Sequence, residues 1–367
     1  MSAADRTVLV TGGTGTLGRE LVRRLVAAHS APHVVVLSRS ALDPDPRLPA
    51  GARVVRGDLA AGAGLGLSLA VREELTRDLT DILHCAADTR FLLPLAEARA
   101  ANVGGTLALL DFAAGCRALR RMGCFSTVYV AGRRVGLVDE RDLDDGAFGF
   151  VNSYEQSKHE MEREIRRRMG ELPIAVYRLS TLIGDSRTGA VSGTNAFHHA
   201  LRLLYHGLAP MVPGRPENKV DLVAVDYVAD AACWLFHRRF EAGRTYHLCS
   251  GARASCTLAE LIDAVVEAFH RFRPEWRRRH VEKPAIVAPE TYDLFVRSVE
   301  ETGNEVLLHA TRAVQSFAGQ LACPKSFDTR ATEAALAGSG LHPPRILDVL
   351  PQVVRTCLEN DWRESAA

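Results

Sequence analysis

The sequence predicts an α/β protein whose core is a Rossmann-type, doubly wound parallel sheet, followed by a smaller, mostly helical C-terminal lobe. Short β-branched runs alternate with helical patterns through the first half of the chain. The runs are continuously apolar, which is typical of strands covered by helices on both faces. A glycine-rich turn follows the first run and opens the first helical pattern. A βαβα order of this kind gives a parallel sheet with helices on its faces.

The expected strands lie at residues 6–12, 33–39, 52–59, 81–87, 124–131 and 174–181. In the first helix, Leu17, Leu21 and Leu25 share one face. A long apolar helix is expected at 95–116 and a second long helix at 154–169. The second begins with glutamates and ends with three arginines before a glycine, an order that suits the helix dipole and a C-terminal cap.

Loops are expected where small and polar residues gather, at 60–67 and 184–194. After residue 183 a strand at 221–226, a helix at 227–239 and a strand at 244–250 precede a mostly helical remainder. We therefore expect residues 1–183 to form a nucleotide-binding core. Residues 184–367 are expected to form a lobe that binds the substrate, with 220–250 returning to the core.

Composition excludes several classes of function. The net charge of +1 predicts neither a nucleic-acid partner nor binding to an anionic membrane surface. The eight cysteines form no CxxC pair, which favours free thiols in a reducing compartment. No apolar run is long enough to span a membrane, and a strand starts at residue 6, so we expect a cytoplasmic protein without a leader. Of the 13 histidines, His199 and His206 share a helical face without a third ligand, so no metal site is expected.

The turn TGGTGTLG at residues 11–18 has the spacing GxxGxxG. Glycines permit a tight turn and a close approach of the backbone to a ligand, and the following helix offers N–H donors to a pyrophosphate. The expected cofactor-binding residues here are Gly12, Thr14, Gly15, Thr16, Leu17 and Gly18. The alternative is a tight strand-to-helix turn without a ligand.

The end of the second strand indicates which dinucleotide is bound. A site for NAD places an acidic residue there, but this chain has Ser38 and Arg39, and the nearest acid is Asp43. A guanidinium matches the 2′-phosphate of NADP(H), which is therefore the favoured cofactor. Arg39 could instead be a solvated loop residue. Asp58 and Leu59 end the third strand and could contact adenine, or Asp58 could cap a helix.

The chain uses arginine almost everywhere, yet Lys158 is one of only four lysines, and it follows Tyr154 by four residues. Residues four apart share a face of a helix. An ammonium beside a phenol lowers the phenol's pKa from about 10 and can also hold a ribose hydroxyl. Such a phenol can exchange a proton with a carbonyl oxygen while hydride moves to carbon, and Ser126 and Thr127 offer a further hydroxyl. The alternative is a tyrosine and a lysine on a solvated face.

The glycine-rich turn, the hydroxyl at the end of the fifth strand and YxxxK together resemble the extended short-chain dehydrogenase/reductases. The resemblance implies that Thr127 is the hydroxyl of the catalytic triad, Tyr154 the acid/base and Lys158 the cofactor-binding lysine. It also implies that Asn102, in NVGGT, supports the active-site strand, and it gives Ser126 a supporting role. It adds Ala86 and Ala87 to the cofactor-binding residues.

Finer matches resemble the thioester reductases, which are related to fatty acyl-CoA reductases and male-sterility proteins. The matching segments are GDL (57–59), LGLS (65–68), HCAADTRF (84–91), STVYVAG (126–132), YEQSKHEME (154–162) and YRLSTLIGDSRTG (177–189). The resemblance implies NADP(H)-dependent reduction of a carrier- or CoA-bound acyl thioester to an aldehyde or alcohol in biosynthesis. Because the first strand starts at residue 6, an enzyme that acts in trans is expected.

Two other functions remain open. The same superfamily contains ketoreductases and nucleotide-sugar epimerases or dehydratases, which act on a ketone or a sugar carbon. A non-catalytic protein that senses the cofactor would need only the glycine-rich turn and Arg39, whereas Thr127, Tyr154 and Lys158 are all present. An oligomer could form through the helices expected at 95–116 and 154–169.

Overall fold

The computed structural model describes residues 6–28, 33–40, 45–279 and 282–365. Within these ranges, seven strands form one parallel sheet in the order β12-β7-β5-β4-β1-β2-β3. Its strands are β1 (Thr7–Thr11), β2 (His33–Ser38), β3 (Ala52–Arg56), β4 (Asp81–His84), β5 (Arg121–Thr127), β7 (Ile174–Leu179) and β12 (Thr245–Leu248). The chain winds outward in both directions from β1, so the predicted doubly wound fold is confirmed.

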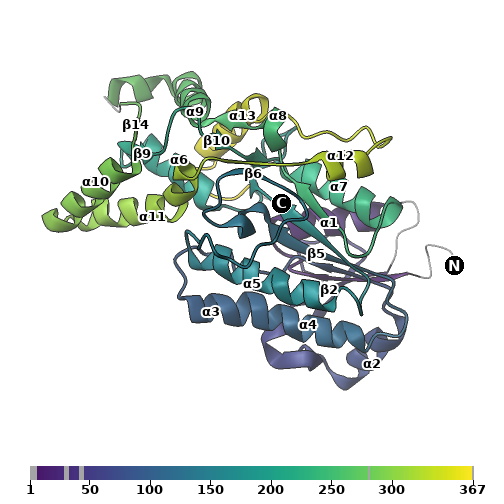
Figure 1. Cartoon of the computed structure of the whole chain (residues 1–367). Coiled ribbons are helices and arrows are strands. Elements are labelled where there is room, and N and C mark those ends of the chain that lie inside the picture. The colour runs from purple at the N-terminus through teal and green to yellow at the C-terminus, as the bar shows by residue number, and fades with distance from the viewer. Residues whose placement is uncertain (1–5, 29–32, 41–44, 280–281, 366–367) are drawn as a thin grey trace.

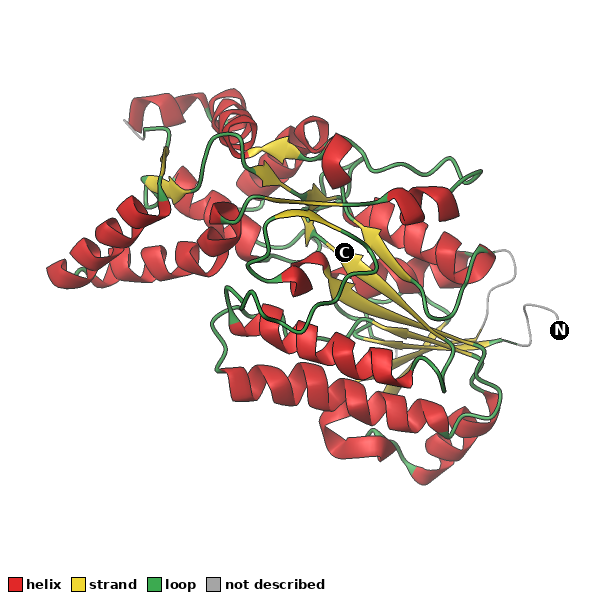
Figure 2. Cartoon of the chain, viewed as in Figure 1, coloured by secondary structure: helices red, strands yellow, loops and turns green. Residues whose placement is uncertain are grey.

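Helices cover both faces of the sheet (Figures 1 and 2). Val8 and Val10 pack with α1 (Thr16–Ala27) and α7 (Val225–Arg238) in one apolar cluster. Leu9 points to the opposite face, because successive strand residues alternate. There it joins a second cluster built with α2 (Leu69–Asp78), α4 (Gly105–Ala114) and α5 (Ser153–Arg168). Burial on both faces explains why the strands read as continuously apolar runs.

The long helix expected at 95–116 is interrupted. It consists of α3 (Leu95–Arg99), a π-turn η3 (Ala100–Gly104) and α4. A π-turn places one extra residue in a helix and is frequent at functional sites. The buried residue of η3 is Asn102, which the sequence singled out as a supporting residue.

Three local predictions were wrong. Residues 128–131 do not continue the fifth strand but form the 3₁₀ turn η4 (Val128–Ala131), because the pairing of β5 with β7 ends at Thr127 and Leu179. The stretch 60–67 is not simply a loop, since η2 (Leu59–Gly64) occupies most of it. The strand expected at 221–226 is only β11 (Leu222–Val223), which pairs with β8 (Thr181–Leu182) before α7 begins.

A third apolar cluster lies beside the sheet. It is built mainly from α6 (Ala196–Tyr205), α9 (Leu258–Phe272) and α13 (Ile346–Glu359). The helices α10 (Pro289–Thr302) and α11 (Glu305–Ala322) pack together and project to one side (Figure 1). The other short elements are β6 (Gly136–Val138), β9 (Met211–Pro213), β10 (Lys219–Val220), α8 (Gly251–Ala254), β13 (Cys256–Thr257), η5 (Pro274–Arg279), β14 (Ala285–Val287), β15 (Lys325–Phe327) and α12 (Arg330–Ala335).

Residues 225–248 extend the sheet rather than the lobe. β12 pairs in parallel with β7, and α7 shares the apolar cluster of α1. The division into domains at residue 183 stays a prediction.

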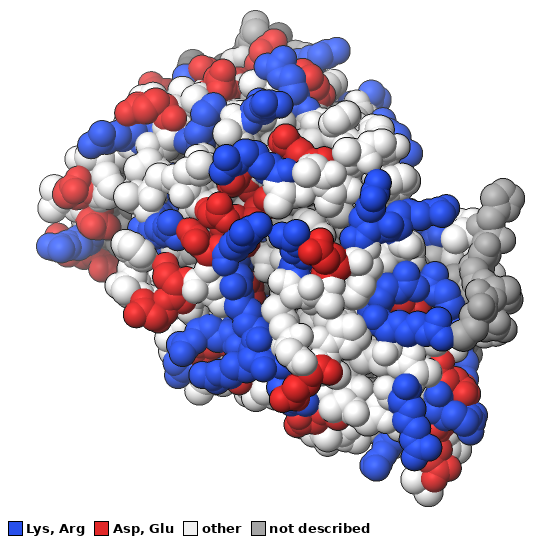
Figure 3. All heavy atoms as spheres, turned by 45° about the vertical axis from the view of Figure 1, so that its right-hand side comes forward, with Lys and Arg blue, Asp and Glu red and all other residues white. Residues whose placement is uncertain are grey.

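On the face shown in Figure 3, cationic and anionic side chains are interspersed. Among the described helices, not one has the length and apolar character needed to cross a bilayer. The eight cysteines, all inside the described ranges, are free thiols.

Candidate functional site

The glycine-rich turn lies where the strand order reverses, beside the end of β4. Gly12 has a φ of 68°, and a Cβ there would lie 2.6 Å from the backbone nitrogen of Ala86. A Cβ on Gly18 would lie 2.1 Å from the carbonyl oxygen of Gly12. These two positions therefore require glycine, the first for conformation and close approach and the second for packing of α1 under the turn.

The first turn of α1 fits a pyrophosphate. Gly15 is its N-cap, no side chain caps the helix, and no acidic residue lies in its first turn. The N–H groups of this end are thus left for an anion, which the helix dipole also favours. Thr14 and Thr16 are partly exposed beside Gly15, while the side chain of Leu17 is buried in the core. Leu17 can therefore contribute only its backbone to such a site.

The residues predicted to bind the adenosine half lie at neighbouring strand ends. Arg39 is exposed after β2, and Ser38 is buried, with its Oγ accepting a hydrogen bond from the Ser40 N–H at 3.2 Å. Asp43 lies outside the described residues. Asp58 accepts a hydrogen bond from the Ala60 N–H at 3.0 Å and caps η2, as one of its two interpretations required. Leu59 packs on Gly105 of α4.

Ala86 and Ala87 follow β4 and face the glycine-rich turn from the other side of the switch point. The N–H of Ala86 donates to Oγ1 of Thr11 at 3.3 Å. Both alanines are accessible, Ala87 more than Ala86. The turn, the alanines and the end of β2 thus share the carboxyl edge of the sheet, where ligands of such folds bind.

Tyr154 lies in the first turn of α5, whose N-cap is Asn152. Its ring packs on Phe91 with 5.4 Å between the ring centroids. Burial raises the pKa of the Tyr154 phenol above its ordinary value, a hydrogen bond with Thr127 lowers it, and the nearby Glu155 raises it. The predicted lowering of the phenol pKa is therefore wrong for this structure, because burial outweighs the favourable contacts. The phenol stays protonated at neutral pH.

Lys158 is buried one turn further along α5, with 3% of its surface exposed. Its Nζ donates to the carbonyl oxygen of Phe125 at 2.8 Å and lies 3.2 Å from Sδ of Met161. Burial lowers the pKa of Lys158 to about 8, although Cys124, Glu162 and Cys85 oppose that shift. A solvated helix face, the alternative interpretation, is excluded for Lys158.

The two hydroxyls at the end of β5 have different partners. Thr127 Oγ1 donates to the carbonyl oxygen of Leu179 at 3.1 Å and accepts from the Tyr129 N–H at 3.2 Å, in addition to its contact with Tyr154. Ser126 Oγ donates instead to Glu162 at 2.9 Å. Ser126 and Thr127 lie on opposite faces of β5. Ser126 therefore contacts α5 at Glu162, whereas Thr127 contacts the Tyr154 phenol.

Glu162 forms a buried ion pair that sequence reasoning missed. It lies 2.7 Å from Nη2 of Arg178, a residue of β7, and neither side chain has exposed surface. Burial alone would raise the pKa of Glu162, but Arg178 and its other donors lower it to about 2. This pair fixes α5 against β7. No local pattern links a helix residue to a strand residue 16 positions later.

Asn102 connects the loop after β4 to α5. Its Oδ1 accepts from the Asp88 N–H at 2.7 Å, and its Nδ2 donates to the Asp88 carbonyl at 3.0 Å and to Ser157 Oγ at 2.9 Å. The resemblance implied support for the catalytic strand β5. In the structure the side-chain hydrogen bonds of Asn102 run to the loop after β4 and to α5 instead.

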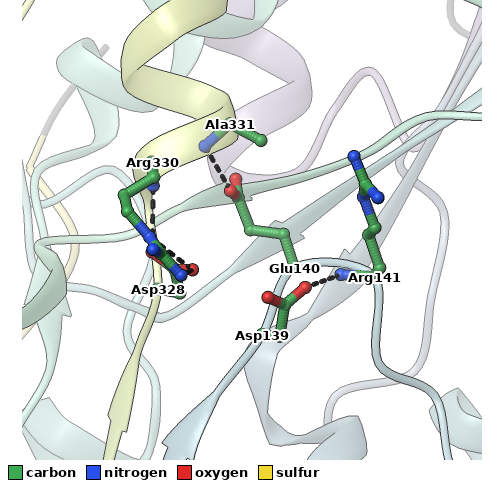
Figure 4. A pocket seen from close by; sticks show the side chains of 6 residues that line it. All are labelled: Asp139, Glu140, Arg141, Asp328, Arg330 and Ala331. Carbon is green, nitrogen blue, oxygen red and sulfur yellow. Dashed lines mark hydrogen bonds and ion pairs between the residues drawn. The ribbon is translucent and has the colours of Figure 1, made fainter.

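A surface hollow of about 300 Å³ lies elsewhere, and Figure 4 shows its six lining residues. Glu140 accepts from the Ala331 N–H at 2.7 Å, and Asp328 binds Arg330 at 2.6 Å. Because these carboxylates already have partners and no predicted site residue lines the hollow, it is not a candidate active site. Within the described part of the chain, no three His, Cys, Asp or Glu side chains are grouped to hold a metal ion.

Comparison with known proteins identifies the family. The model of an NAD-binding family described as male sterility protein matches residues 48–232, half of the chain, including Thr127, Tyr154 and Lys158. The chain belongs to this family. Male sterility proteins are part of the extended short-chain dehydrogenase/reductases, and this chain falls in their thioester reductase-like branch. The cofactor class of this family is a nicotinamide dinucleotide.

Several relatives of this male sterility family member are reductases by name. It is 29% identical over 271 residues to glycine betaine reductase ATRR of Emericella nidulans, covering 66% of this chain and 21% of that protein. It is 29% identical over 311 residues to carboxylic acid reductase of Segniliparus rugosus, covering 72% and 26% respectively. The chain thus spans only about a fifth to a quarter of the length of these two relatives.

Solved structures support the fold of this family member. The terminal R domain from the myxalamid PKS-NRPS biosynthetic pathway matches with a TM-score of 0.79 and 24% identity. The match covers 99% of this chain and 92% of that one. At this level of identity the likeness concerns the fold.

Proposed function

We propose that this protein is an NADP(H)-dependent reductase that converts an acyl thioester, bound to a carrier protein or to coenzyme A, into an aldehyde or alcohol. One observation carries the proposal. The phenol of Tyr154 contacts Thr127 at the carboxyl end of β5, on the same helix as the buried Lys158 and at the sheet edge that holds the glycine-rich turn.

The proposed roles follow from the positions of these side chains. Tyr154, whose raised pKa keeps it protonated, donates a proton to the carbonyl oxygen of the substrate, and Thr127 helps by holding the phenol in place through their contact. Lys158 holds the nicotinamide ribose. The bound cofactor supplies a hydride to the carbonyl carbon. The balance is one hydride and one proton consumed for each thioester converted to an aldehyde and a free thiol.

The glycine-rich turn and α1 would hold the pyrophosphate, and Ala86 and Ala87 would lie against the adenosine half. The helix end without a cap and the absence of room for a Cβ at Gly12 support this assignment. NADP(H) rather than NAD is proposed because an exposed guanidinium, Arg39, follows β2.

Replacing Arg39 with alanine is expected to weaken NADPH binding about tenfold or more and to leave NADH binding nearly unchanged. A charge-assisted hydrogen bond to a phosphate is worth roughly 1.5–3 kcal/mol, and NADH has no 2′-phosphate. Fluorescence titration of both cofactors measures this difference. Arg77→Ala, which removes an exposed arginine from α2, is the matched control. Equal weakening of both cofactors by Arg39→Ala, or tighter binding of NADH by the wild type, would rule out the NADP assignment.

The thioester assignment is tested by the second product. Incubation with NADPH and an acyl thioester is expected to release free thiol in step with NADPH oxidation, which a thiol-reactive dye can follow. Acyl-carrier and acyl-CoA substrates are compared directly, with a matched ketone and aldehyde as the other arms. Efficient ketone reduction without any thiol release would favour the ketoreductase alternative.

Two broader assignments belong to the same proposal. Residues 184–367 would supply the substrate lobe, while 220–250 complete the sheet through β12. The helices α4 and α5 would carry an interface between copies if the protein forms an oligomer. Limited proteolysis at residues 184–194 tests the division into core and lobe. Measurement of the mass in solution tests whether copies associate.

A further inference from the structure

Lys325 is the second buried lysine of a chain that has only four. It has 7% of its surface exposed, close to the 3% of Lys158, whereas Lys219 and Lys283 are exposed. Arginine supplies nearly every other positive charge in this protein. A buried ammonium is costly unless it is paired and hydrogen-bonded, so its partners indicate what it is for.

Lys325 contacts two segments that lead to the proposed catalytic hydroxyls. Its Nζ donates to the carbonyl oxygen of Gly132. Gly132 is the C-cap of η4, the 3₁₀ turn that directly follows Thr127 at the end of β5. The same Nζ donates to Oε1 of Gln320 at 3.2 Å. Lys325 begins β15 and Gln320 lies in the last turn of α11, so these two residues come from the C-terminal part of the chain, whereas Gly132 follows the catalytic strand.

Gln320 continues the network to the helix that carries Tyr154. Its Nε2 donates to Oε1 of Glu155, the residue next to Tyr154. Glu155 is 1% exposed, and its carboxylate also accepts from the Val151 N–H at 3.1 Å and from Asn152 Nδ2 at 3.2 Å. The carboxylate therefore folds back over the N-terminus of α5 and fixes its first turn.

Close packing supports the same junction. A Cβ on Gly319 would lie 2.4 Å from Cγ1 of Val151, so the end of α11 rests directly on the residue that precedes the N-cap of α5. The two segments are therefore in direct contact at this point. A continuous set of hydrogen bonds thus runs from the Gly132 carbonyl through the Lys325 ammonium and the Gln320 amide to the Glu155 carboxylate. It joins segments that are distant in sequence.

We propose that Lys325 and Gln320 are positioning residues, which set the distance between Thr127 and Tyr154 by clamping η4 to the start of α5 through Glu155. The inference rests on the proposed catalytic role of Tyr154. The buried ammonium of Lys325 is shared between two acceptors. One is the Gly132 carbonyl beside Thr127, and the other is the Gln320 amide, which in turn binds the Glu155 carboxylate beside Tyr154. None of the three side chains needs to touch the substrate.

The charges around the network agree with this role. Burial raises the pKa of Glu155, and Gln320, the Val151 N–H, Lys325 and Arg133 lower it. Burial lowers the pKa of Lys325, and Glu155 and Cys323 raise it. Each group thus favours the charged form of the other. Glu155 also raises the pKa of Tyr154, so the network acts on the phenol electrostatically as well as by position.

The test compares Lys325→Met, Gln320→Ala and the double variant. Each is expected to lower turnover per NADPH-binding site roughly tenfold or more, because small misplacement of catalytic groups is costly. The affinity for NADPH stays within twofold, since neither residue belongs to the cofactor site. The double variant is no worse than the poorer single variant, because both changes break one chain of contacts. Amide hydrogen exchange at residues 128–134 and 150–156 is expected to quicken in all three.

Lys283→Met is the matched control, because it removes an exposed lysine that pairs with Asp263 in the lobe. Turnover unchanged in folded Gln320→Ala and Lys325→Met, or two losses that simply add, would overturn the inference. If Lys325→Met does not fold, Gln320→Ala decides, since it leaves both buried charges in place. Any carbonyl that the wild type reduces can serve as substrate. Failure with thioesters alone would therefore count against the proposed substrate and not against the network, and the exchange measurement needs no substrate.

Discussion

Replacing Tyr154 with phenylalanine is expected to lower turnover by about 10²–10⁴-fold while NADPH still binds. General acid catalysis is typically worth this factor, and phenylalanine removes the proton donor without removing the ring. The ring contact with Phe91 is kept, so the fold around the first turn of α5 should persist. Single-turnover oxidation of bound NADPH measures the chemical step, and fluorescence titration measures the cofactor affinity.

Tyr292→Phe is the control for this variant. Tyr292 is buried in α10, in the apolar cluster shared with α11, and this cluster contains none of the proposed site residues. Its loss of a hydroxyl should leave turnover unchanged. A Tyr154→Phe variant that retains more than about a tenth of wild-type turnover would mean that another group supplies the proton.

The second large effect is expected for Lys158→Arg, which should lose turnover and also bind NADPH more weakly. The ammonium is enclosed, 2.8 Å from the Phe125 carbonyl and 3.2 Å from Met161 Sδ. A guanidinium is wider and planar, so it cannot occupy this space without displacing the ribose or its protein neighbours. We expect a loss of roughly 10²-fold in turnover, because misplacement of groups at the reacting centre is costly.

The matched substitution is Lys219→Arg, at an exposed position in β10, which should behave as the wild type. Thermal unfolding of both variants separates a packing defect from a catalytic one. If Lys158→Arg turned over at near-wild-type rate, a positive charge alone would suffice at this position. The proposed contact of the ammonium with the ribose would then have to be abandoned.

The sheet was predictable because each strand is buried on both faces and therefore reads as an apolar run. Its boundaries were not, as residues 128–131 show. Val128 and Val130 are as apolar and β-branched as any strand residue, but the ladder stops where β7 ends at Leu179. Strand ends depend on the neighbouring strands, which a local pattern does not contain. The prediction of a loop at 60–67 was wrong for a different reason. Leu59 packs on α4 and Asp58 caps the segment, and these contacts hold a glycine-rich stretch in 3₁₀ turns.

The site was predictable to the extent that its signals are local. Tyr154 and Lys158 are one helical turn apart, and the glycine-rich turn is continuous in sequence. Alternation along β5 places Ser126 and Thr127 on opposite faces, but only the fold shows which face meets the phenol. The partners of Glu155 could not be inferred, since Gln320 follows it by 165 residues and belongs to another element. The raised pKa of Tyr154 was missed because burial is a property of the assembled fold.

The π-turn at 100–104 makes the phase of one helix part of the site. One residue of an α-helix corresponds to a rotation of about 100°. The extra residue in η3 therefore rotates α3 relative to α4 by that angle. The side chains that share one face of α4 are thus not continued on the same face of α3. A deletion of a single residue there would restore an even helical repeat. It would also swing α3 and Asn102 around the helix axis, parting the amide from Asp88 and Ser157. The length of this segment is thus as constrained as the identity of Asn102 within it.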